Sequence, residues 1–416
     1  MDKKIIFTPV TMHGSQAGMK TKTKGAYGRL RFTPVLPEGL ASAGYYLRKH
    51  IRFTPAISGL EDRGKIEKEG NSFTLDWWTK TAMFNYDALM ISTFYGLEKS
   101  NFREYYNIPR KNFLLFADSG GFQIFSQKIK IEPLYVLKWQ ERNVDVGLTL
   151  DVPPLDASQN VVGDFDTFKR AAEQSKRNYL IAHRNWNEKL ELLKVIHGSS
   201  PSRLDYWKKT VEDLEFSGYA FSPKPVCAET VAIVLAYAKE IGAKKIHIFL
   251  GSGEVVTPIM IYARKFFDRL TFDSSSFSSA GARYRRYYLP YKISRGISFG
   301  GGYNGKIKNL PCSCPVCQLA TVKDMNAEGS LPGGLIALHN LYVYLQYYHF
   351  LTNLSDDEEL YKAFLNDRGL KTTVRMLDFL DYSAEVGFYD AYNTVFEKEK
   401  TTSYTNFFGS KENGSQ

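Results

Sequence analysis

The sequence predicts an α/β fold, and within that class a closed barrel of eight parallel strands, the TIM (β/α)8 barrel. Short apolar runs recur along the chain, and longer amphipathic stretches separate most of them. Apolar strands that alternate with helices are typical of a parallel sheet, whose strands are buried on both faces. In addition, acidic residues directly follow several of the runs. A doubly wound open sheet is the alternative, because strands are difficult to count from one sequence.

We predict eight strands beyond about residue 80, and they are the segments 88–94, 112–121, 144–152, 190–198, 218–223, 245–253, 269–277 and 296–302. The segments 164–186 and 256–269 are examples of the helices between them. These strands define a barrel domain over residues 81–302, which we expect to contain the active site. We expect residues 346–416 to form C-terminal helices that close the barrel.

The N-terminal part of the chain repeats the phrase F-T-P, at residues 5–10, 30–35 and 51–56. In each copy a short apolar run is stopped by proline, which suits edge strands because proline lacks a backbone N–H. Three copies are too few for a solenoid. We therefore predict that residues 1–80 form accessory strands beside the barrel.

The composition excludes several classes of protein. The chain has 416 residues, of which 44% are hydrophobic and 14% aromatic, enough for a large core and against global disorder. Four cysteines, three of them clustered, leave no disulfide framework and predict a reducing, cytoplasmic location. No window approaches about 18 apolar residues, and the start lacks the apolar core of a signal peptide. We therefore predict no membrane span.

Three of the four cysteines stand within residues 312–317, which is the spacing of metal ligands rather than of isolated thiols. Cys312, Cys314 and Cys317, together with His339 downstream, form a Cys3His set of the kind that binds zinc tetrahedrally. Four protein ligands leave no open position, so this zinc would be structural. We expect His339 to open a helix and residues 303–345 to form a zinc-binding subdomain inserted after the barrel. A few buried thiols are the alternative.

Acidic residues end three of the predicted strands: Asp118, Asp151 and Asp273. His197 ends a fourth. In a barrel of this type the carboxyl ends of the strands converge on the active site, so we expect these side chains to lie together. Burying several carboxylates is costly unless they are partnered, and neighbouring carboxylates raise each other's pKa. The alternative is that each aspartate caps the helix that follows it.

An excess of basic residues favours a polyanionic partner. Lysine and arginine number 54 and aspartate and glutamate 44, so the formal net charge is 54 − 44 = +10. In the segment 281–292, Arg283, Arg285 and Arg286 alternate with tyrosines. Arginines that bind phosphate beside rings that stack on bases suit an extruded or single-stranded base. The alternative is a solvated loop with a few core tyrosines.

Two motifs carry a resemblance to a known family. The segment "ADSGGFQIFS" (117–126) resembles the signature of the tRNA-guanine transglycosylases, and "CSCPVCQ" with the later "HN" resembles their zinc site. Three further segments, "LTLDVPP", "GYAFSPKP" and "RLTFDSSSF", follow in the family's order, so the resemblance covers about residues 88–350. The family is a TIM barrel with a zinc subdomain, and it exchanges a guanine in nucleic acid for a 7-deazaguanine without ATP or a redox cofactor.

The resemblance implies roles for the three aspartates. Asp273 would be the nucleophile that attacks C1′ of the sugar, Asp118 the general acid and base, and Asp151 the residue that binds the Watson–Crick edge of the base. Elementary chemistry agrees, because an oxocarbenium-like centre is trapped by one carboxylate while a second carries the proton. Around them the expected substrate-binding residues are Ser119, Gly120, Gly121, Gln123, His197, Gly218 and Tyr219. The glycines would leave room for a flat base.

The chain also departs from the family in its base-facing loops. It has "VPP" after Asp151, His197–Gly198 in place of a glutamine–glycine pair, and "SSSFSS" after Asp273. This divergence resembles the DpdA branch, which inserts 7-cyano-7-deazaguanine into DNA. We therefore predict a partner nucleic acid that is DNA rather than tRNA, a free 7-deazaguanine base as second substrate, and a partner protein that opens DNA. A transglycosylase acting on tRNA and a non-catalytic nucleic-acid-binding subunit are the alternatives.

Overall fold

The computed structural model of the chain describes residues 51–57, 65–68, 70–127, 129–155, 163–290, 292–300, 303, 305 and 307–397. The F-T-P repeats at residues 5–10 and 30–35 therefore lie outside the described residues. Among the described helices, none combines the length and the apolar character needed to cross a membrane.

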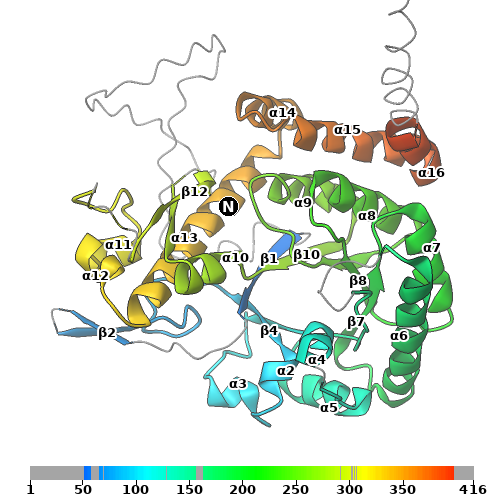
Figure 1. Cartoon of the computed structure of the whole chain (residues 1–416), viewed down its shortest axis with the longest axis horizontal. Helices are drawn as coiled ribbons and strands as arrows, with labels where there is room; N and C mark the ends of the chain where they lie inside the picture. Colours follow the sequence, from blue (N-terminus) through cyan, green and yellow to red (C-terminus); the bar gives the residue numbers. More distant parts are fainter. Residues whose placement is uncertain are drawn as a thin grey trace, which may run out of the picture.

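Eight parallel strands close into a barrel, which confirms the predicted fold class (Figure 1). Around the barrel the order is β1, β4, β5, β6, β7, β8, β9 and β10, and β10 pairs with β1 again. The strands are β1 (Ile51–Ile57), β4 (Ala88–Ser92), β5 (Leu114–Asp118), β6 (Val146–Leu148), β7 (Glu191–His197), β8 (Gly218–Ser222), β9 (Lys245–Ile248) and β10 (Arg269–Ser274). Most of their side chains are buried, as expected for strands covered on both faces.

Helices alternate with these strands and form the outer layer (Figure 1). They are α2 (Thr93–Gly96), α3 (Phe102–Tyr105), α4 (Gly121–Gln127), α5 (Pro133–Asn143), α6 (Phe165–Asn185), α7 (Pro201–Thr210), α8 (Ala228–Glu240), α9 (Thr257–Ala263) and the 3-10 helix η1 (Arg264–Phe266). Local sequence explains several starts. Asp164 caps α6 by accepting hydrogen bonds from the N–H groups of Asp166 and Thr167. Proline in the first turn of α5 and α7 presets the helical backbone.

Two predicted strand positions are wrong. The segment 51–56 was expected beside the barrel, but it forms β1, a barrel strand between β10 and β4. Its proline does not mark a sheet edge: Pro55 is the last residue paired with β10, so its missing N–H falls where pairing passes to β4. The segment 296–302 was expected to be the eighth barrel strand. Its described start instead belongs to β12 (Lys292–Ser298), which pairs with β11 (Arg286–Leu289) in a separate hairpin.

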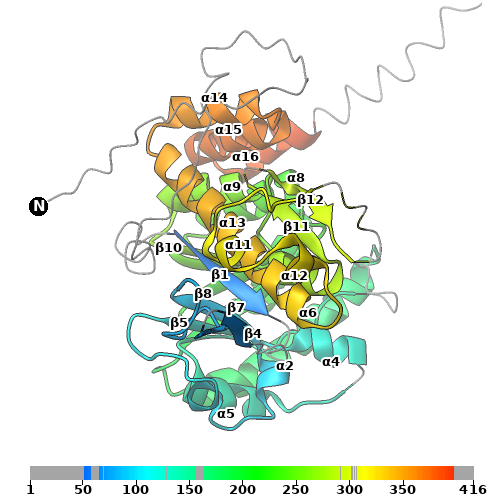
Figure 2. The same cartoon turned by 90° about the vertical axis from the view of Figure 1, so that its left-hand side faces the viewer.

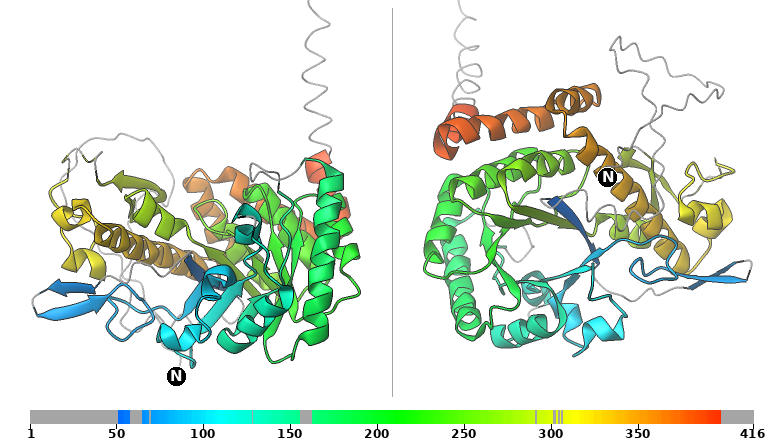
Figure 3. Two further views of the ribbon diagram at one scale, coloured as in Figure 1. Left: turned by 60° about the horizontal axis from the view of Figure 1, so that its bottom comes forward. Right: turned by 180° about the vertical axis from the view of Figure 1, so that it is seen from behind.

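A second group of elements lies beside the barrel. It contains α10 (Ser276–Ser278), the π-helix η2 (Ser279–Arg283), the β11–β12 hairpin, α11 (Pro315–Leu319) and α12 (Val322–Asn326), with α11, α12 and β11–β12 seen together in Figure 2. The hairpin of β2 (Lys65–Lys68) and β3 (Asn71–Thr74) lies nearby (Figure 1). The long helix α13 (Leu331–Leu354) separates α11 and α12 from the barrel strands (Figures 1 and 3). The apolar positions expected to face inward are buried, namely Leu338, Leu341, Val343, Tyr344 and Tyr347.

The C-terminal helices pack outside the barrel's own helices. They are α14 (Glu358–Asp367), α15 (Lys371–Val386), α16 (Phe388–Tyr392) and the π-helix η3 (Asn393–Glu397). Helix α15 contacts both α8 and α9, and Figure 3 shows it along their outer side. Buried Met376, Leu377 and Leu380 supply the apolar face of this contact.

Candidate active site and metal centre

The polar residues predicted to converge do lie at the carboxyl ends of the barrel strands. Asp118 is the last residue of β5, His197 is the last residue of β7, and Asp273 is the next-to-last residue of β10. Asp151 follows β6 and is buried. Parallel strands bring all four to one rim of the barrel, which is where such folds carry their active sites.

Asp118 sits in a dry environment that favours its neutral form. Its Oδ1 accepts hydrogen bonds from the backbone N–H of Gly120 at 2.9 Å and of Thr93 at 3.2 Å. Burial nevertheless dominates and, with the nearby charge of Asp273, raises the pKa of Asp118 to about 7. A carboxyl group with this pKa can both give and take a proton near neutral pH.

The neighbours of Asp118 hold its strand end in place. The Thr93 hydroxyl donates to the Asp118 carbonyl oxygen at 2.5 Å. The buried amide of Gln140 donates to the Thr93 hydroxyl at 3.0 Å and to the Leu148 carbonyl at 3.1 Å. Sequence reasoning did not identify Thr93 or Gln140, because neither belongs to a motif.

Asp273 is also buried, but its contacts differ. Its Oδ1 accepts a hydrogen bond from the backbone N–H of Leu250 at 2.9 Å and lies 3.3 Å from Nε2 of His247. Both contacts reach the same oxygen, so Oδ2 takes part in neither. The strand is fixed from the other side by Thr54 of β1, whose hydroxyl donates to the Phe272 carbonyl at 3.0 Å.

Asp151 forms a buried triad with Ser119 and His197. The Ser119 hydroxyl donates to Oδ1 at 2.5 Å, and Nε2 of His197 donates to Oδ2 at 2.6 Å. Burial alone would raise the pKa of Asp151, but these hydrogen bonds and the charge of His197 outweigh it and lower the pKa. The His197 ring packs on Trp207, with centroids 4.7 Å apart. Asp151 is thus an ionised, oriented acceptor.

The two glycines of the signature are explained by contacts within the protein. Gly120 has φ of +77°, which favours glycine, and a Cβ there would lie 3.1 Å from Phe94. A Cβ on Gly121 would lie 2.5 Å from the Asp151 carbonyl oxygen. Protein atoms occupy the space beside both glycines, so these positions do not show the room for a flat base that we expected. Gln123 follows in α4, and its Oε1 is buried without a hydrogen-bond partner among the described residues.

Gly218 and Tyr219 are not brought together with the other predicted site residues. They begin β8, at the opposite end of the barrel from the aspartates. The register pairs Leu193 with Gly218 and His197 with Ser222, so Ser222 reaches the level of the site. Within the segment 218–225 we selected the first two residues, Gly218 and Tyr219. The strand continues to Ser222, so the residues at the level of the site come at its end.

A small pocket lies beside the Asp151 triad. His197, Ser199, Arg203, Ser222 and Lys224 line its polar part, and prolines 153 and 154 line its apolar part. Burial lowers the pKa of Lys224, and the negative charge of Asp151 opposes that shift. Neither Asp118 nor Asp273 lines this pocket, so it adjoins the pair of carboxyl groups rather than containing it. Sequence reasoning missed Arg203, and within the segment 218–225 it selected Gly218 and Tyr219 rather than Ser222 and Lys224.

Two of the predicted nucleic-acid-binding arginines are exposed. Arg283 ends η2 with its guanidinium 5.6 Å from the ring centroid of Tyr284, and both side chains are exposed. Arg286 is exposed at the start of β11. Arg283 and Tyr284 together present a cation beside an aromatic face, which is suited to a phosphate and an unstacked base.

The rest of that segment is structural. Arg285 donates hydrogen bonds to the carbonyl oxygens of Ala327 and Gly329, so it ties the segment to the end of α12. Tyr287 and Tyr288 are buried. The interpretation of these rings as stacking surfaces is therefore wrong for Tyr287 and Tyr288, and the alternative of core tyrosines holds for these two.

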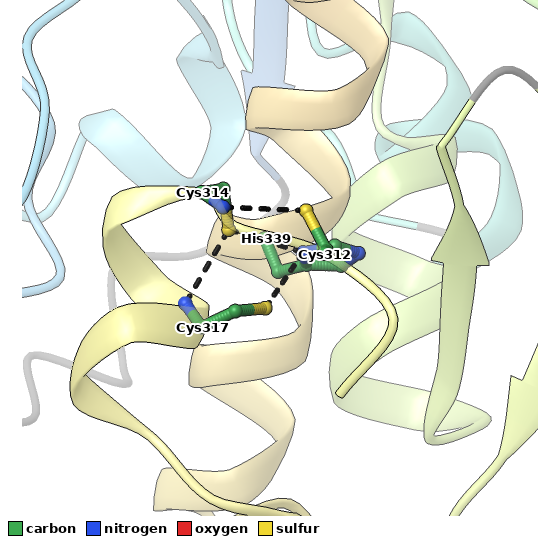
Figure 4. A group of neighbouring side chains, drawn as sticks. All are labelled: Cys312, Cys314, Cys317 and His339. Carbon is green, nitrogen blue, oxygen red and sulfur yellow. Dashed lines mark hydrogen bonds between the residues drawn. The ribbon is translucent and has the colours of Figure 1, made fainter. Parts of the chain in front are cut away.

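The three cysteines and the histidine do come together (Figure 4). The ligand atoms of Cys312, Cys314, Cys317 and His339 all lie within 4.8 Å of one another. Nε2 of His339 donates to the Tyr288 carbonyl at 2.9 Å, so Nδ1 presents its lone pair to the sulfur atoms. Nδ1 lies 3.3 Å from the sulfurs of Cys314 and Cys317. This donor set fits one metal ion.

The surroundings of the cluster add two contacts that the sequence did not reveal. The Tyr287 ring stacks on His339, with centroids 3.7 Å apart and planes 7° apart, and its hydroxyl lies 3.1 Å from the Cys317 sulfur. The expectation that His339 opens a helix is wrong. It lies inside α13, which begins at Leu331, and this position buries its side chain completely.

With this geometry established, comparison with known proteins identifies similar chains. The tRNA-guanine(15) transglycosylase of Methanococcus vannielii is 26% identical over 320 residues, which cover 69% of this chain and 46% of the relative. That of Saccharolobus solfataricus is 24% identical over 322 residues, covering 70% and 59%. That of Methanocaldococcus jannaschii is 29% identical over 250 residues, covering 55% and 35%. No family model matches the chain.

The fold and the site together define a class of protein. Its members have a parallel barrel with carboxyl groups at one rim and a Cys3His cluster beside the barrel. These relatives are 24–29% identical to this chain, and their names favour the tRNA-guanine transglycosylase superfamily. The chain spans about half the length of the curated relatives it matches, with 46% of the first two covered. The DpdA branch stays a prediction.

Proposed function

We propose that this chain is a base-exchange transglycosylase that replaces guanine in a nucleic acid with a 7-deazaguanine through a covalent aspartyl–sugar intermediate. One observation carries the proposal: two carboxyl groups share one rim of the barrel in different environments. Burial and the charge of Asp273 raise the pKa of Asp118 to about 7, while Asp273 is held by the Leu250 N–H. Such a pair is what a retaining displacement at a sugar carbon needs.

In the first step Oδ2 of Asp273 attacks C1′ as the bond from C1′ to the guanine nitrogen breaks. The departing base takes its electron pair and a proton from Asp118. In the second step Asp118 removes a proton from the incoming base, whose nitrogen attacks C1′ and releases Asp273. Each step conserves protons, so Asp118 ends the cycle as it began.

Asp151 is proposed to bind the Watson–Crick edge of both bases. Ser119 and His197 keep it ionised and oriented, and its remaining lone pairs can accept N–H groups of a purine. Phe94, half-buried and next to Gly120, offers a ring for stacking. The unpartnered Oε1 of Gln123 is a further acceptor for the base. The target base must first leave its stack to reach this site.

The test of the proposal is exchange of radiolabelled guanine into a nucleic acid, with wild type and Asp273→Asn compared. The variant should lose exchange completely, while nucleic-acid binding and metal content stay unchanged. Wild type without an incoming base should also form a covalent complex that survives denaturation, and Asp273→Asn should not. Exchange at the wild-type rate in Asp273→Asn would refute the assignment. Binding without any exchange by wild type would favour the non-catalytic subunit.

For the polymer we propose DNA, with tRNA as a second candidate that the names of the relatives favour. What supports DNA is that the base-facing loops depart from the pattern of the tRNA enzymes, as at His197, which contacts Asp151. Arg283 and Tyr284 bind either polymer, because phosphate contacts carry no sequence information. A duplex target would cost a few kcal/mol of unpairing and unstacking, so we also propose a partner protein that opens DNA.

The Cys3His cluster is proposed to hold one zinc ion in a structural role. Its four protein ligands leave no coordination position for a substrate. The metal would supply rigidity, joining α11 to α13 and to the β11–β12 hairpin through Cys314, His339 and Tyr288. The cytoplasmic location predicted from the cysteine content stays a prediction.

A further inference from the structure

A buried histidine lies directly beneath the proposed nucleophile, and the mechanism above does not use it. His247 is on β9, and its side chain is completely buried inside the barrel. Nε2 lies 3.3 Å from Oδ1 of Asp273. The rings of Phe116 and Phe249 lie on other sides, with centroids 5.3 and 5.2 Å from that of the imidazole.

The position of one hydrogen atom on His247 follows from its other contact. Nδ1 lies 2.9 Å from the hydroxyl oxygen of Thr271, and that hydroxyl donates its single hydrogen to the Ile246 carbonyl at 3.2 Å. A threonine hydroxyl has one hydrogen, so while it donates to that carbonyl it can only accept from the imidazole. In this arrangement Nδ1 carries a hydrogen.

The second nitrogen then has two possible states. If Nε2 carried no hydrogen, its lone pair would face an ionised carboxylate oxygen in a dry interior, which is repulsive. Nε2 is a buried atom without a directed hydrogen bond among the described residues, so no other group offsets this repulsion there. A proton between Nε2 and Asp273 removes the conflict.

We propose that His247 is a positively charged positioning residue that keeps Asp273 ionised in the free enzyme, a role that rests on the proposed function of Asp273. Among the described residues, Asp118 of β5 is a titratable group that interacts electrostatically with Asp273. The neighbour of His247 on β8 is Ala220, which carries no charge. His247 thereby assigns the roles: the carboxyl group beside it attacks as an anion, and Asp118 retains the proton for the leaving base.

The charges balance through the first step. Before attack, His247 is positive, Asp273 is negative and Asp118 is neutral. Attack turns Asp273 into a neutral ester, and transfer of a proton to the base turns Asp118 negative, while His247 keeps its charge. The summed charge of these three side chains therefore stays at zero, and a single negative charge moves from Asp273 to Asp118.

The proton on Nε2 can be measured without any activity. The chain has seven histidines, so the ring nitrogen signals of His247 can be identified in NMR spectra as those missing from His247→Gln. At pH 7 we expect both ring nitrogens of His247 to be protonated in wild type. In Asp273→Asn only Nδ1 should be protonated, because the new amide donates to Nε2. A neutral His247 in wild type at pH 7 would overturn the proposal.

Kinetics test the consequence for catalysis. Glutamine at position 247 can still donate a hydrogen bond but carries no charge. The acidic limb of the pH profile of kcat/KM should therefore move up by about 1 to 3 pH units in His247→Gln, and the basic limb should stay in place. His183→Gln, on the exposed surface of α6, is the matched control. An equal loss at every pH would indicate a merely structural role and contradict the proposal.

The two experiments separate the possible failures. Absence of exchange by wild type would remove the proposed function, and the NMR result would still decide whether the buried pair holds the proton. A protonated His247 combined with an unshifted pH profile would leave the transglycosylase standing and remove the role proposed for His247.

Discussion

Asp118 and Asp273 show how the same side chain acquires two chemical roles from its surroundings. Asp118 accepts hydrogen bonds from two backbone N–H groups, yet burial dominates and raises its pKa to about 7. Asp273 has a backbone N–H and an imidazole at one oxygen. In a displacement at a sugar carbon the first environment suits a proton donor and the second an anion.

The raised pKa of Asp118 predicts a conflict between activity and stability. A carboxyl group whose pKa is higher in the folded state than its ordinary value of 3.8 binds protons more tightly when folded. The ionised Asp118 therefore lowers the free energy of unfolding. This destabilisation is absent below pH 3.8, grows as the pH rises, and is complete above about pH 7. Asp118→Asn should therefore raise the melting temperature at pH 8 and raise it less at pH 5.

Asp164→Asn is the matched control for that experiment. The carboxylate of Asp164 caps α6, and its pKa is lowered by hydrogen bonds from Thr167 and from backbone N–H groups. Its charge therefore stabilises the fold above its ordinary pKa, so its loss should not raise the melting temperature at pH 8. A melting temperature of Asp118→Asn that shows no dependence on pH would contradict the raised pKa.

Lys224 predicts which 7-deazaguanine is accepted. Its ammonium group is partly buried on the pocket wall near Asp151. It can donate to an uncharged 7-cyano group, whereas it repels the ammonium of an aminomethyl group. Wild type should prefer the 7-cyano base in a competition assay. Lys224→Ala should lower that preference roughly tenfold, a difference of about 1.4 kcal/mol.

Lys209→Ala, which removes an exposed charge from α7, should leave the preference between the two bases unchanged. Lys224→Glu should invert the preference, because a carboxylate attracts the aminomethyl ammonium. If wild type chose the aminomethyl base and Lys224→Ala kept that choice, the assignment of the pocket wall would be wrong.

At the scale of elements, the close packing of η2 on α13 couples the metal centre to the barrel. Gly281 lies in η2, and a Cβ there would lie 2.3 Å from the backbone nitrogen of Ala337 and 2.8 Å from the carbonyl carbon of Ile336. These are backbone atoms of a helix, so they cannot move aside individually. The helix that carries His339 is thus fixed against the segment that leads from β10 to β11.

Gly281→Ala should therefore destabilise the protein by about 1 to 3 kcal/mol, the usual cost of overpacking. Denaturant unfolding measures this free energy. Gly163→Ala is the control, since a Cβ at Gly163 would meet no atom of the described residues within 4 Å. Equal stability of the two variants would show that η2 and α13 are not packed this closely.

The Cys3His cluster predicts that removal of one ligand lowers thermal stability and metal content together. Cys314→Ala removes the most buried of the three sulfur ligands, and the remaining donors no longer complete a tetrahedral site. Elemental analysis should show loss of about one zinc ion per chain, and the melting temperature should fall in the same samples. Cys227→Ser, which changes the free thiol at the start of α8, should retain the metal. Full metal content in Cys314→Ala would contradict the ligand set.

Elements were predictable from the sequence where local pattern decides the structure. The strands that carry Asp118, His197 and Asp273 are short, mostly apolar segments, and the cysteines 312, 314 and 317 have ligand spacing. β1 was misplaced because its role depends on pairing with β10, far away in the sequence. Gly218 was misplaced because the end of β8 is set by its register with β7. Long-range pairing of this kind leaves no local pattern.

The same reason explains which site residues were missed. His247 belongs to no motif, and Lys224 lies in the segment 218–225 without being marked out by it. Both matter only because the fold brings them near Asp273 and Asp151. The tyrosines 287 and 288 alternate with arginines on an exposed segment, yet the fold turns them inward against α13 and His339. Alternation alone did not reveal which face was covered.

At the scale of the whole molecule, the net charge favours a nucleic acid without selecting DNA or RNA. The net charge of +10 predicts binding to either polymer. Nucleosides from the DNA and the tRNA of cells with and without this protein should differ in deazapurine content by mass spectrometry. We expect the deazapurine in DNA only when the protein is present. Modified tRNA with unmodified DNA would overturn the choice of DNA and leave the two-carboxylate mechanism intact.

The place of β1 in the barrel has a consequence for biosynthesis. The Thr54 hydroxyl donates to the Phe272 carbonyl, 218 residues later in the chain. During translation β1 is synthesised long before β10. Most of its pairing is with β10, so most of β1 stays unpaired until β10 has been synthesised. Such distant contacts slow folding. Until β10 arrives, a nascent chain has unpaired strand edges that can bind other chains. The strand that bears Asp273 completes the barrel, so the proposed nucleophile is positioned in the same event that removes this hazard.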